Sequence, residues 1–172
     1  MSYDLLALIE ISLAPDIGIV KAMRIAKECK ALKQQSDSEH HVLRVWERGW
    51  DRVPKVLKCL RQLRGFTVIS LKCLIKVKSE KIHHILRKAG FSKITFVGRI
   101  VGYKTIEKGL IVIAERTTDP KTIVLKLCKA QIPTFPLPPS ACCIMGYDPY
   151  EEALRNISIL RDVAKDIASV KP

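Results

Sequence analysis

Acidic side chains are scarce in the middle third of the chain. Between Arg44 and Lys104 the sequence has 16 lysines or arginines but only three acids, Glu47, Asp51 and Glu80. The rest of the 172-residue chain has equal numbers of basic and acidic residues, so the formal net charge of +13 comes from this one region. Three acids cannot neutralise 16 bases locally, which argues against the mixed-sign ion-pair networks that support heat stability.

Long apolar runs are also missing. The run near the start, Leu5 to Ile9, is broken by Glu10 and has no basic leading region, so we expect neither a signal peptide nor a membrane span. Hydrophobic residues make up 48% of the chain and charged residues 27%, a balance typical of a globular protein with a buried core. We therefore expect a cytoplasmic protein whose residues 1–172 form a single compact domain.

The six cysteines lack the spacing of a zinc site or a redox pair. No C-x-x-C motif is present, so reduced and mostly buried thiols are expected. Cys142 and Cys143 are adjacent, and in a strand one thiol would face inward and the other outward. A redox or metal role for this pair stays open.

A convergent set of catalytic groups is likewise absent. His83 and His84 are adjacent, so on a helix their side chains point about 100° apart and cannot serve one metal. The glycine-containing loop at residues 97–109 matches neither a dinucleotide-binding fingerprint nor a P-loop. We expect no cofactor and no metal, and the sequence favours a protein without catalytic activity.

Hydrophobic periodicity predicts alternating strands and helices along the chain. Strands are expected at residues 3–12, 41–48, 66–78, 93–97 and 110–115, with a possible edge strand at 141–145. Helices are expected from residue 16 to about 35, at 49–65, at 79–89, at 117–128 and from Asp148 onward, and residues 34–39 form a polar loop. The last helix begins with an acid, a proline and a glutamate, a strong start signal, and has one apolar side formed by Ala153, Ile157, Leu160, Ala164 and Ile167.

The strand at 66–78 has a clear period of two. Its apolar side chains are Thr67, Ile69, Leu71, Cys73, Ile75 and Val77, whereas Ser70, Lys72, Lys76 and Lys78 alternate with them. Because successive side chains of a strand point to opposite faces, one face should pack and the other should be wet.

These elements predict an α+β fold. From Phe66 to Met145 the expected order is strand, helix, strand, strand, helix, strand, which is that of a ferredoxin-like split βαβ core, about residues 66–145. Residues 1–65 would add an N-terminal βαβα extension, and residues 148–172 a C-terminal helix. The three parts, 1–65, 66–147 and 148–172, would be sub-units of the single domain. A three-layer α/β sandwich is the alternative, because the alternation also suits parallel βαβ units.

The basic region has three explanations: solubility, an ion-pair network, or a surface for a polyanion. We favour the polyanion, since Lys and Arg that neutralise phosphates generate much of the affinity for nucleic acid. The packed strand face would leave Lys72, Lys76 and Lys78 on an open face of the sheet. The candidate nucleic-acid-binding residues are Lys55, Lys58, Arg61, Lys72, Lys76, Lys78, Lys81, Arg87, Lys88, Arg99 and Lys104.

Aromatic residues are interleaved with these charges and could stack on unpaired bases. They are Trp46, Trp50, Phe66, Phe91, Phe96 and Tyr103. No zinc-finger pattern, KH G-x-x-G loop or RRM signature accompanies them, so the sequence has no recognised nucleic-acid-binding motif.

The sequence therefore predicts a non-catalytic nucleic-acid-binding protein, with RNA favoured over DNA. The alternatives are an assembly subunit that docks an acidic protein and, less favoured, an enzyme that acts on an anionic small molecule. A pocket lined by Arg99, Tyr103 and Glu115 would favour the enzyme. The extended segment from Pro133 to Pro139, or the C-terminal helix, could contact a protein partner.

Overall fold

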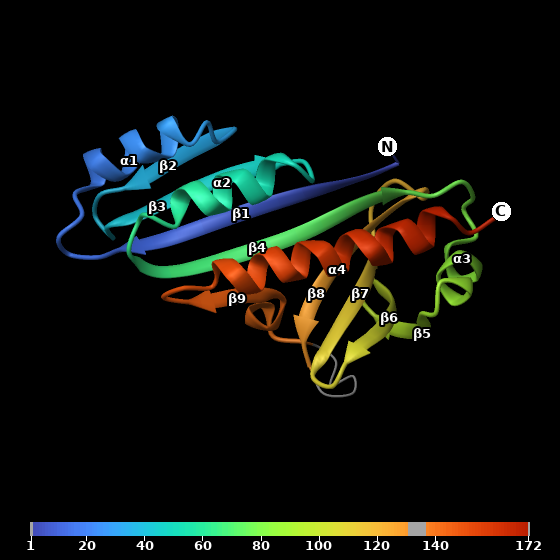
Figure 1. The fold of residues 1–172 in the computed structure, drawn as a ribbon. Coiled ribbons are helices and arrows are strands. Elements are labelled where there is room, and N and C mark those ends of the chain that lie inside the picture. Colours follow the sequence, from blue (N-terminus) through green and yellow to red (C-terminus); the bar gives the residue numbers. More distant parts are fainter. Residues whose placement is uncertain (1, 131–136, 172) are drawn as a thin grey trace. The chain divides into compact units, whose positions relative to one another are not determined.

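The computed structural model describes residues 2–130 and 137–171, apart from the side chains of Phe96, Val97 and Pro139. These residues form four α-helices, a short 3-10 helix and nine strands, which confirms the α+β class (Figure 1). The chain divides into two compact units. The N-terminal unit comprises Leu5–Leu71 and Cys143–Arg155, and the central unit comprises Met1–Asp4, Lys72–Cys142 and Asn156–Pro172.

The N-terminal unit is built mainly from the first half of the chain. Its elements are β1 (Tyr3–Leu13), α1 (Ile19–Glu28), β2 (Lys33–Asp37), β3 (Val42–Arg48), α2 (Arg52–Leu60), the first part of β4 (Gly65–Lys76), β9 (Cys143–Gly146) and the start of α4 (Tyr150–Ala168). The strand order is β2-β3-β1-β4, and β9 pairs antiparallel with β4 from Thr67 to Ser70. The β1–β3 and β2–β3 pairs are also antiparallel.

Alternating burial explains how this sheet packs. In β1, Leu5, Ala7 and Ile9 are buried, and the residues between them are less so. The helices α1 and α2 each bury one apolar side, and both contact β3. A disulfide between Cys29, at the end of α1, and Cys59, in the last turn of α2, joins the two helices covalently.

Gly65 begins β4 at a place where no other residue fits. Its φ is +153°, and a Cβ atom built there would collide with the carbonyl oxygen of Ser12. The close approach of the two backbones therefore depends on the missing side chain.

The central unit continues the chain from the second part of β4. It contains α3 (Ile82–Lys88), β5 (Ser92–Val97), β6 (Ile100–Glu107), β7 (Leu110–Arg116), β8 (Thr122–Lys129), the 3-10 helix η1 (Pro139–Cys142) and most of α4. Its strands lie in the order β4-β8-β7-β6-β5, and the pairs from β4–β8 to β5–β6 are antiparallel. This antiparallel pairing excludes the three-layer sandwich of parallel units.

Strand registers define two faces of this sheet. Cys73 pairs with Leu125, Leu125 with Ala114, and Ala114 with Gly102, so these residues share one face. A Cβ atom on Gly102 would lie 3.7 Å from the side chain of Leu86 in α3. We call this the helix face, because α3 covers it.

The opposite face, here called the outer face, carries the alternating residues of the same strands. Ile111, Ile113 and Cys128 form a buried cluster there, and Leu137 and Cys142 pack against it. A disulfide between Cys128 and Cys142 attaches the segment that packs on this cluster to β8. The centre of β7 is buried on both faces for this reason.

The predicted position of the ferredoxin-like order, residues 66–145, is wrong. The helix expected at 117–128 is strand β8, whose β-branched residues Thr122, Ile123 and Val124 pair with β7 and β4. The loop at 97–109 contains strand β6, and the polar loop at 34–39 overlaps β2, a strand without a buried residue. Both strands have weak apolar alternation, which is the signal that periodicity requires.

Other expectations are confirmed. Thr67, Ile69, Leu71, Cys73, Ile75 and Val77 are all buried, and Lys72, Lys76 and Lys78 are exposed. The five apolar residues expected along the C-terminal helix are all buried in α4. None of the described helices is long and apolar enough to cross a membrane.

The expectation of reduced cysteines is wrong for four of the six. Cys29, Cys59, Cys128 and Cys142 form two disulfides, whereas Cys73 and Cys143 are thiols. The paired cysteines are 30 and 14 residues apart, so a search for C-x-x-C spacing could not detect them. Reduced thiols therefore no longer support a cytoplasmic location.

Candidate nucleic-acid interface

Strand β4 places two candidate lysines on the outer face of the central sheet. Lys72 and Lys76 alternate with Cys73 and Ile75, which lie on the helix face, and Lys76 pairs across the sheet with Thr122. Lys72 and Lys76 make no ion pair within the described residues. Lys76 is close enough to Asp119 to help lower the pKa of that carboxyl, although hydrogen bonds from Lys121 and Thr122 have larger effects.

Acids from distant parts of the sequence neutralise two arginines of the basic region, the candidate Arg61 and its neighbour Arg64. Arg61 forms ion pairs with Asp148 at 3.0 Å and with Glu151 at 2.8 Å, and these contacts raise the pKa of Arg61. Arg64 pairs with Asp16 in the same unit. Lys55 and Lys58 remain exposed on α2.

Lys104 has a structural role in the central unit. Its Nζ donates a hydrogen bond to the Ala89 carbonyl at 3.0 Å and lies 3.7 Å from a carboxylate oxygen of Asp166. A cation at the last carbonyls of a helix stabilises that terminus. Lys104 therefore ties α3 to β6 and α4 and contributes little charge to a ligand.

A group of cations without acidic partners among the described residues lies at α3. We call it the α3 cluster, defined as Lys81, Arg87, Lys88, Lys93 and Arg116. All five side chains are exposed, and none forms an ion pair with an acid in the described part of the chain. Arg99, another candidate, is exposed in the β5–β6 turn, and its carbonyl accepts a hydrogen bond from the Arg116 amide.

Beside this cluster is a cavity of about 460 Å³, which we call the α3 cavity. Its lining comes from α3, from the turn into β5 and from β6: His83, His84, Leu86, Arg87, Phe91, Ser92, Lys93 and Val101. Phe91, Leu86 and Val101 are buried and form its apolar wall. None of the described residues that line the cavity is acidic.

Contacts with Arg116 define the protonation state of His83. An Arg116 Nη2 nitrogen lies 3.2 Å from His83 Nε2, and because a guanidinium can only donate, Nε2 accepts. The ring is then neutral, with its proton on the buried Nδ1, which has no acceptor among the described residues. Burial, and then the positive charges of Lys93 and Arg116, lower the pKa of His83.

The predicted site residues are thus divided among three places. Lys72 and Lys76 lie on the outer face, whereas α3 covers the helix face, so one flat surface cannot hold both groups. Lys81, Arg87 and Lys88 gather at α3, and Lys78 precedes them in the β4–α3 connection. Lys55, Lys58 and Arg61 belong to the N-terminal unit.

Sequence reasoning overlooked Lys93 and Arg116 as members of the site and did not join the histidines into a cavity. Arg116 is 33 residues from His83, and only the β5–β6–β7 meander brings it to α3. The sequence signal that could have linked them is that the segments of α3, Lys93 and Arg116 all carry basic residues. Glu115 pairs with Lys126 at 3.2 Å on the outer face, and the pocket of Arg99, Tyr103 and Glu115 that would favour an enzyme is absent from the described cavities.

The interleaved aromatic residues differ in exposure. Trp50 and Phe91 are buried, Trp46 and Tyr103 are partly exposed, and Phe66 is exposed and packs edge-to-face on Tyr147. Lys33 lies over the Trp46 ring, with its Nζ 4.9 Å from the ring centroid. The side chain of Phe96 lies outside the described structure.

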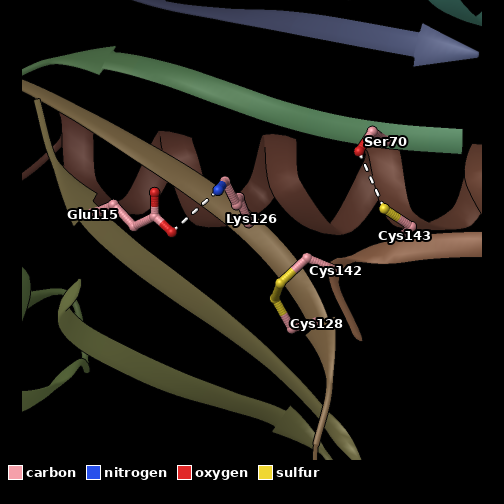
Figure 2. Close-up of a disulfide and its surroundings, with 6 residues drawn as sticks. All are labelled: Ser70, Glu115, Lys126, Cys128, Cys142 and Cys143. Carbon is pink, nitrogen blue, oxygen red and sulfur yellow. Dashed lines mark hydrogen bonds and ion pairs between the residues drawn. A yellow bond between two sulfur atoms is a disulfide. The ribbon is translucent and has the colours of Figure 1, made fainter. Parts of the chain in front are cut away.

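The adjacent cysteines have different chemistry. Figure 2 shows Cys142 in its disulfide with Cys128, and Cys143 with its sulfur 3.3 Å from the Ser70 hydroxyl oxygen. No group of three His, Cys, Asp or Glu side chains suited to a metal occurs in the described residues. Of the possible protein-binding segment from Pro133 to Pro139, residues 133–136 lie outside the described structure.

The fold and the site together define an α+β protein with a concave, cationic surface at α3. No family model matches the sequence, and no curated protein is significantly similar to it.

Proposed function

We propose that the protein binds nucleic acid without catalysis, and RNA in preference to DNA, through the α3 cluster. The observation that carries this proposal is the set of five exposed cations beside a cavity without an acid. Cations that have no acidic partner are available to phosphates, and releasing condensed counterions from RNA drives binding. Lys78, in the connection that leads to α3, would extend the same surface.

The outer face offers a second, separate contact. Lys72 and Lys76 are exposed there and would meet a different part of a long or folded RNA. Arg61 and Lys104 would contribute little to RNA binding, because their charges are already paired with acids. Lys55 and Lys58 stay candidates for an additional contact on α2.

The preference for RNA rests on exposed aromatic side chains. Unpaired bases, which are common in RNA loops, stack on aromatic rings. Trp46, Phe66 and Tyr103 retain enough exposure to serve in this way.

We also infer that the N-terminal unit has the ferredoxin-like arrangement. Its elements run strand, helix, strand, strand, helix, strand from β1 to β4, and the strand order is β2-β3-β1-β4. The inferred core is therefore residues 5–71 of this unit, shifted toward the start of the chain from the predicted 66–145. A likeness of fold says nothing by itself about function.

Salt dependence tests the electrostatic mechanism. The full-length protein would be titrated into labelled structured RNA, single-stranded RNA and duplex DNA, with binding followed by fluorescence anisotropy. If six to ten phosphates are contacted, affinity should fall roughly 10³ to 10⁵-fold between about 50 and 200 mM salt. The double variant R87E/K88E should weaken binding and reduce the slope of log affinity against log salt by about 2.

Two further variants separate local contacts from net charge. K21E/K27E, in exposed positions of α1, removes the same formal charge as R87E/K88E and should bind much as the wild type does. The RNA affinity of K72E/K76E shows whether the outer face contributes to binding. Equal losses in R87E/K88E and K21E/K27E would refute a local site at α3, and no binding to any nucleic acid at the lowest salt would favour the acidic-protein partner instead.

A further inference from the structure

The α3 cavity is a hollow in the basic surface with no acid among its described lining residues, unlike the cavity at Arg61 and Arg64, which Asp148 also lines. Its cations come from two elements, with Arg87 on α3 and Lys93 on β5, and they share the cavity with His83 and His84. Arg116, at the end of β7, contacts His83, with its Nη2 3.2 Å from His83 Nε2. The nucleic-acid chain continues on both sides of an internal phosphodiester, which therefore fits an open surface. The chain continues on only one side of a terminal phosphate, which can therefore enter a cavity.

The charge in the cavity matches a doubly charged anion. Arg87 and Lys93 are permanently positive near neutral pH, and a phosphate monoester carries a charge of about −1.5 to −2 at pH 7. Each charged group would have several N–H donors for the phosphate oxygens. The buried side chains of Leu86, Phe91 and Val101 supply an apolar wall for the sugar or base next to the phosphate.

We propose that the α3 cavity binds a terminal phosphate monoester, with Arg87 and Lys93 as charged donors and His83 as a group that takes up a proton when the ligand binds. The ligand would be either the phosphorylated end of an RNA or a free nucleoside monophosphate. The RNA form of this proposal rests on the proposed RNA-binding function, but the cavity itself can be tested without RNA.

The role of His83 follows from the charges around it. Lys93 on β5 and Arg116 on β7 act directly on its ring, and His84 and Arg87 on α3 line the same cavity. None of these groups is an acid, and burial, followed by the charges of Lys93 and Arg116, lowers the pKa of His83. A bound dianion opposes that effect and raises the pKa of His83, so the ring should gain a proton on binding.

The first experiment uses inorganic phosphate as the probe and isothermal titration calorimetry as the readout. The full-length protein should bind phosphate, and R87Q/K93Q should bind it at least tenfold more weakly, because each charge-assisted hydrogen bond has a substantial share in affinity. K21Q/K27Q on α1 is the matched control and should retain wild-type affinity. Equal phosphate affinity in the wild type and R87Q/K93Q would overturn the proposal.

Proton uptake separates the role of His83 from that of a purely structural residue. Titrations at pH 6.5 in two buffers with different ionisation enthalpies give the number of protons taken up. H83Q keeps an acceptor for Arg116 but cannot titrate, so the wild type should take up more protons than H83Q. Because the titration of the phosphate itself is common to both proteins, equal uptake would overturn the assignment of His83.

The two ligand sources are distinguished with matched ligands. One pair is a nucleoside and its 5′-monophosphate, and the other is one RNA sequence with a 5′-phosphate or a 5′-hydroxyl. Tighter binding of the 5′-phosphorylated RNA, lost in R87Q/K93Q, supports an RNA end. Binding of the monophosphate with no RNA binding at all supports a free nucleotide and removes the proposed RNA function. RNA binding that ignores the 5′-phosphate, together with no phosphate binding, removes the cavity proposal and leaves RNA binding standing.

Discussion

Replacing both Cys29 and Cys59 by serine should destabilise the protein strongly. The disulfide closes a loop of 30 residues, and by the chain-entropy model that closure contributes roughly 3.6 kcal/mol to the free energy of unfolding at 25 °C. The cross-link restricts the unfolded chain, so the loss should appear even if α1 and α2 keep their positions. For a chain of this size the midpoint of thermal unfolding should fall by about 7 to 14 °C.

The measurement is urea unfolding of the wild type and of C29S/C59S without reductant, followed by circular dichroism. The comparison variant is C128S/C142S, which opens a loop of 14 residues and should lose roughly 3.0 kcal/mol. Adding a reductant should lower the stability of the wild type and leave a variant that lacks both disulfides unchanged. An unfolding free energy for C29S/C59S equal to that of the wild type would refute the reasoning, as would peptide mass spectrometry that finds Cys29 and Cys59 as thiols.

Two other predictions concern the backbone at β4 and the remaining thiols. G65A should cost more than about 2 kcal/mol of unfolding free energy in urea titrations, because its Cβ would meet the Ser12 carbonyl oxygen, and wild-type stability would contradict the close approach. In the native, non-reduced protein a thiol-alkylating reagent should label the partly exposed Cys143 and spare Cys73, where burial, and then the charge of Asp4, raise the pKa to about 12. Rapid labelling of Cys73, measured by mass spectrometry, would show that its strand opens or that the thiol is not buried.

Local sequence patterns predicted the β4 surface correctly because a strand has a fixed geometry. A period of two places Lys72 and Lys76 opposite Cys73 and Ile75 whatever the rest of the chain does. The same reasoning failed at residues 117–128, where spacing of apolar residues suited a helix. There the β-branched run of Thr122, Ile123 and Val124 joined two strands that sequence alone did not bring together.

Counting charges along the sequence overestimated the unpaired charge of the basic region. Arg61 finds Asp148 and Glu151, 87 and 90 residues away, and Lys104 finds Asp166. A region of the sequence that contains few acids can still form ion pairs with acids from distant parts of the sequence once the chain has folded. Within the described residues, the cations of the α3 cluster and the outer-face lysines of β4 form no ion pair with an acid, and neither do Lys55 and Lys58 on α2. This subset could not be separated before the topology was known.

The α3 cavity illustrates the same limit for a site. The adjacent histidines could be seen in the sequence, but their relation to Lys93 and Arg116 depends on how β5, β6 and β7 turn back beside α3. Likewise each disulfide joins cysteines whose separation in the sequence carries no recognisable spacing.

The two compact units share secondary structure, which limits how the protein can be divided. Three of the four boundaries between them fall within β1, after Asp4, within β4, after Leu71, and within α4, after Arg155, so three hydrogen-bonded elements belong to both; the fourth lies between η1 and β9, after Cys142. No single continuous stretch of chain contains all of either unit and nothing of the other. An expression fragment cut at any of the first three points would end in the middle of a strand or a helix, and neither unit can be exchanged as a single continuous segment between proteins. Evolution by domain shuffling would face the same obstacle, since a recombination point that respects one unit interrupts the other.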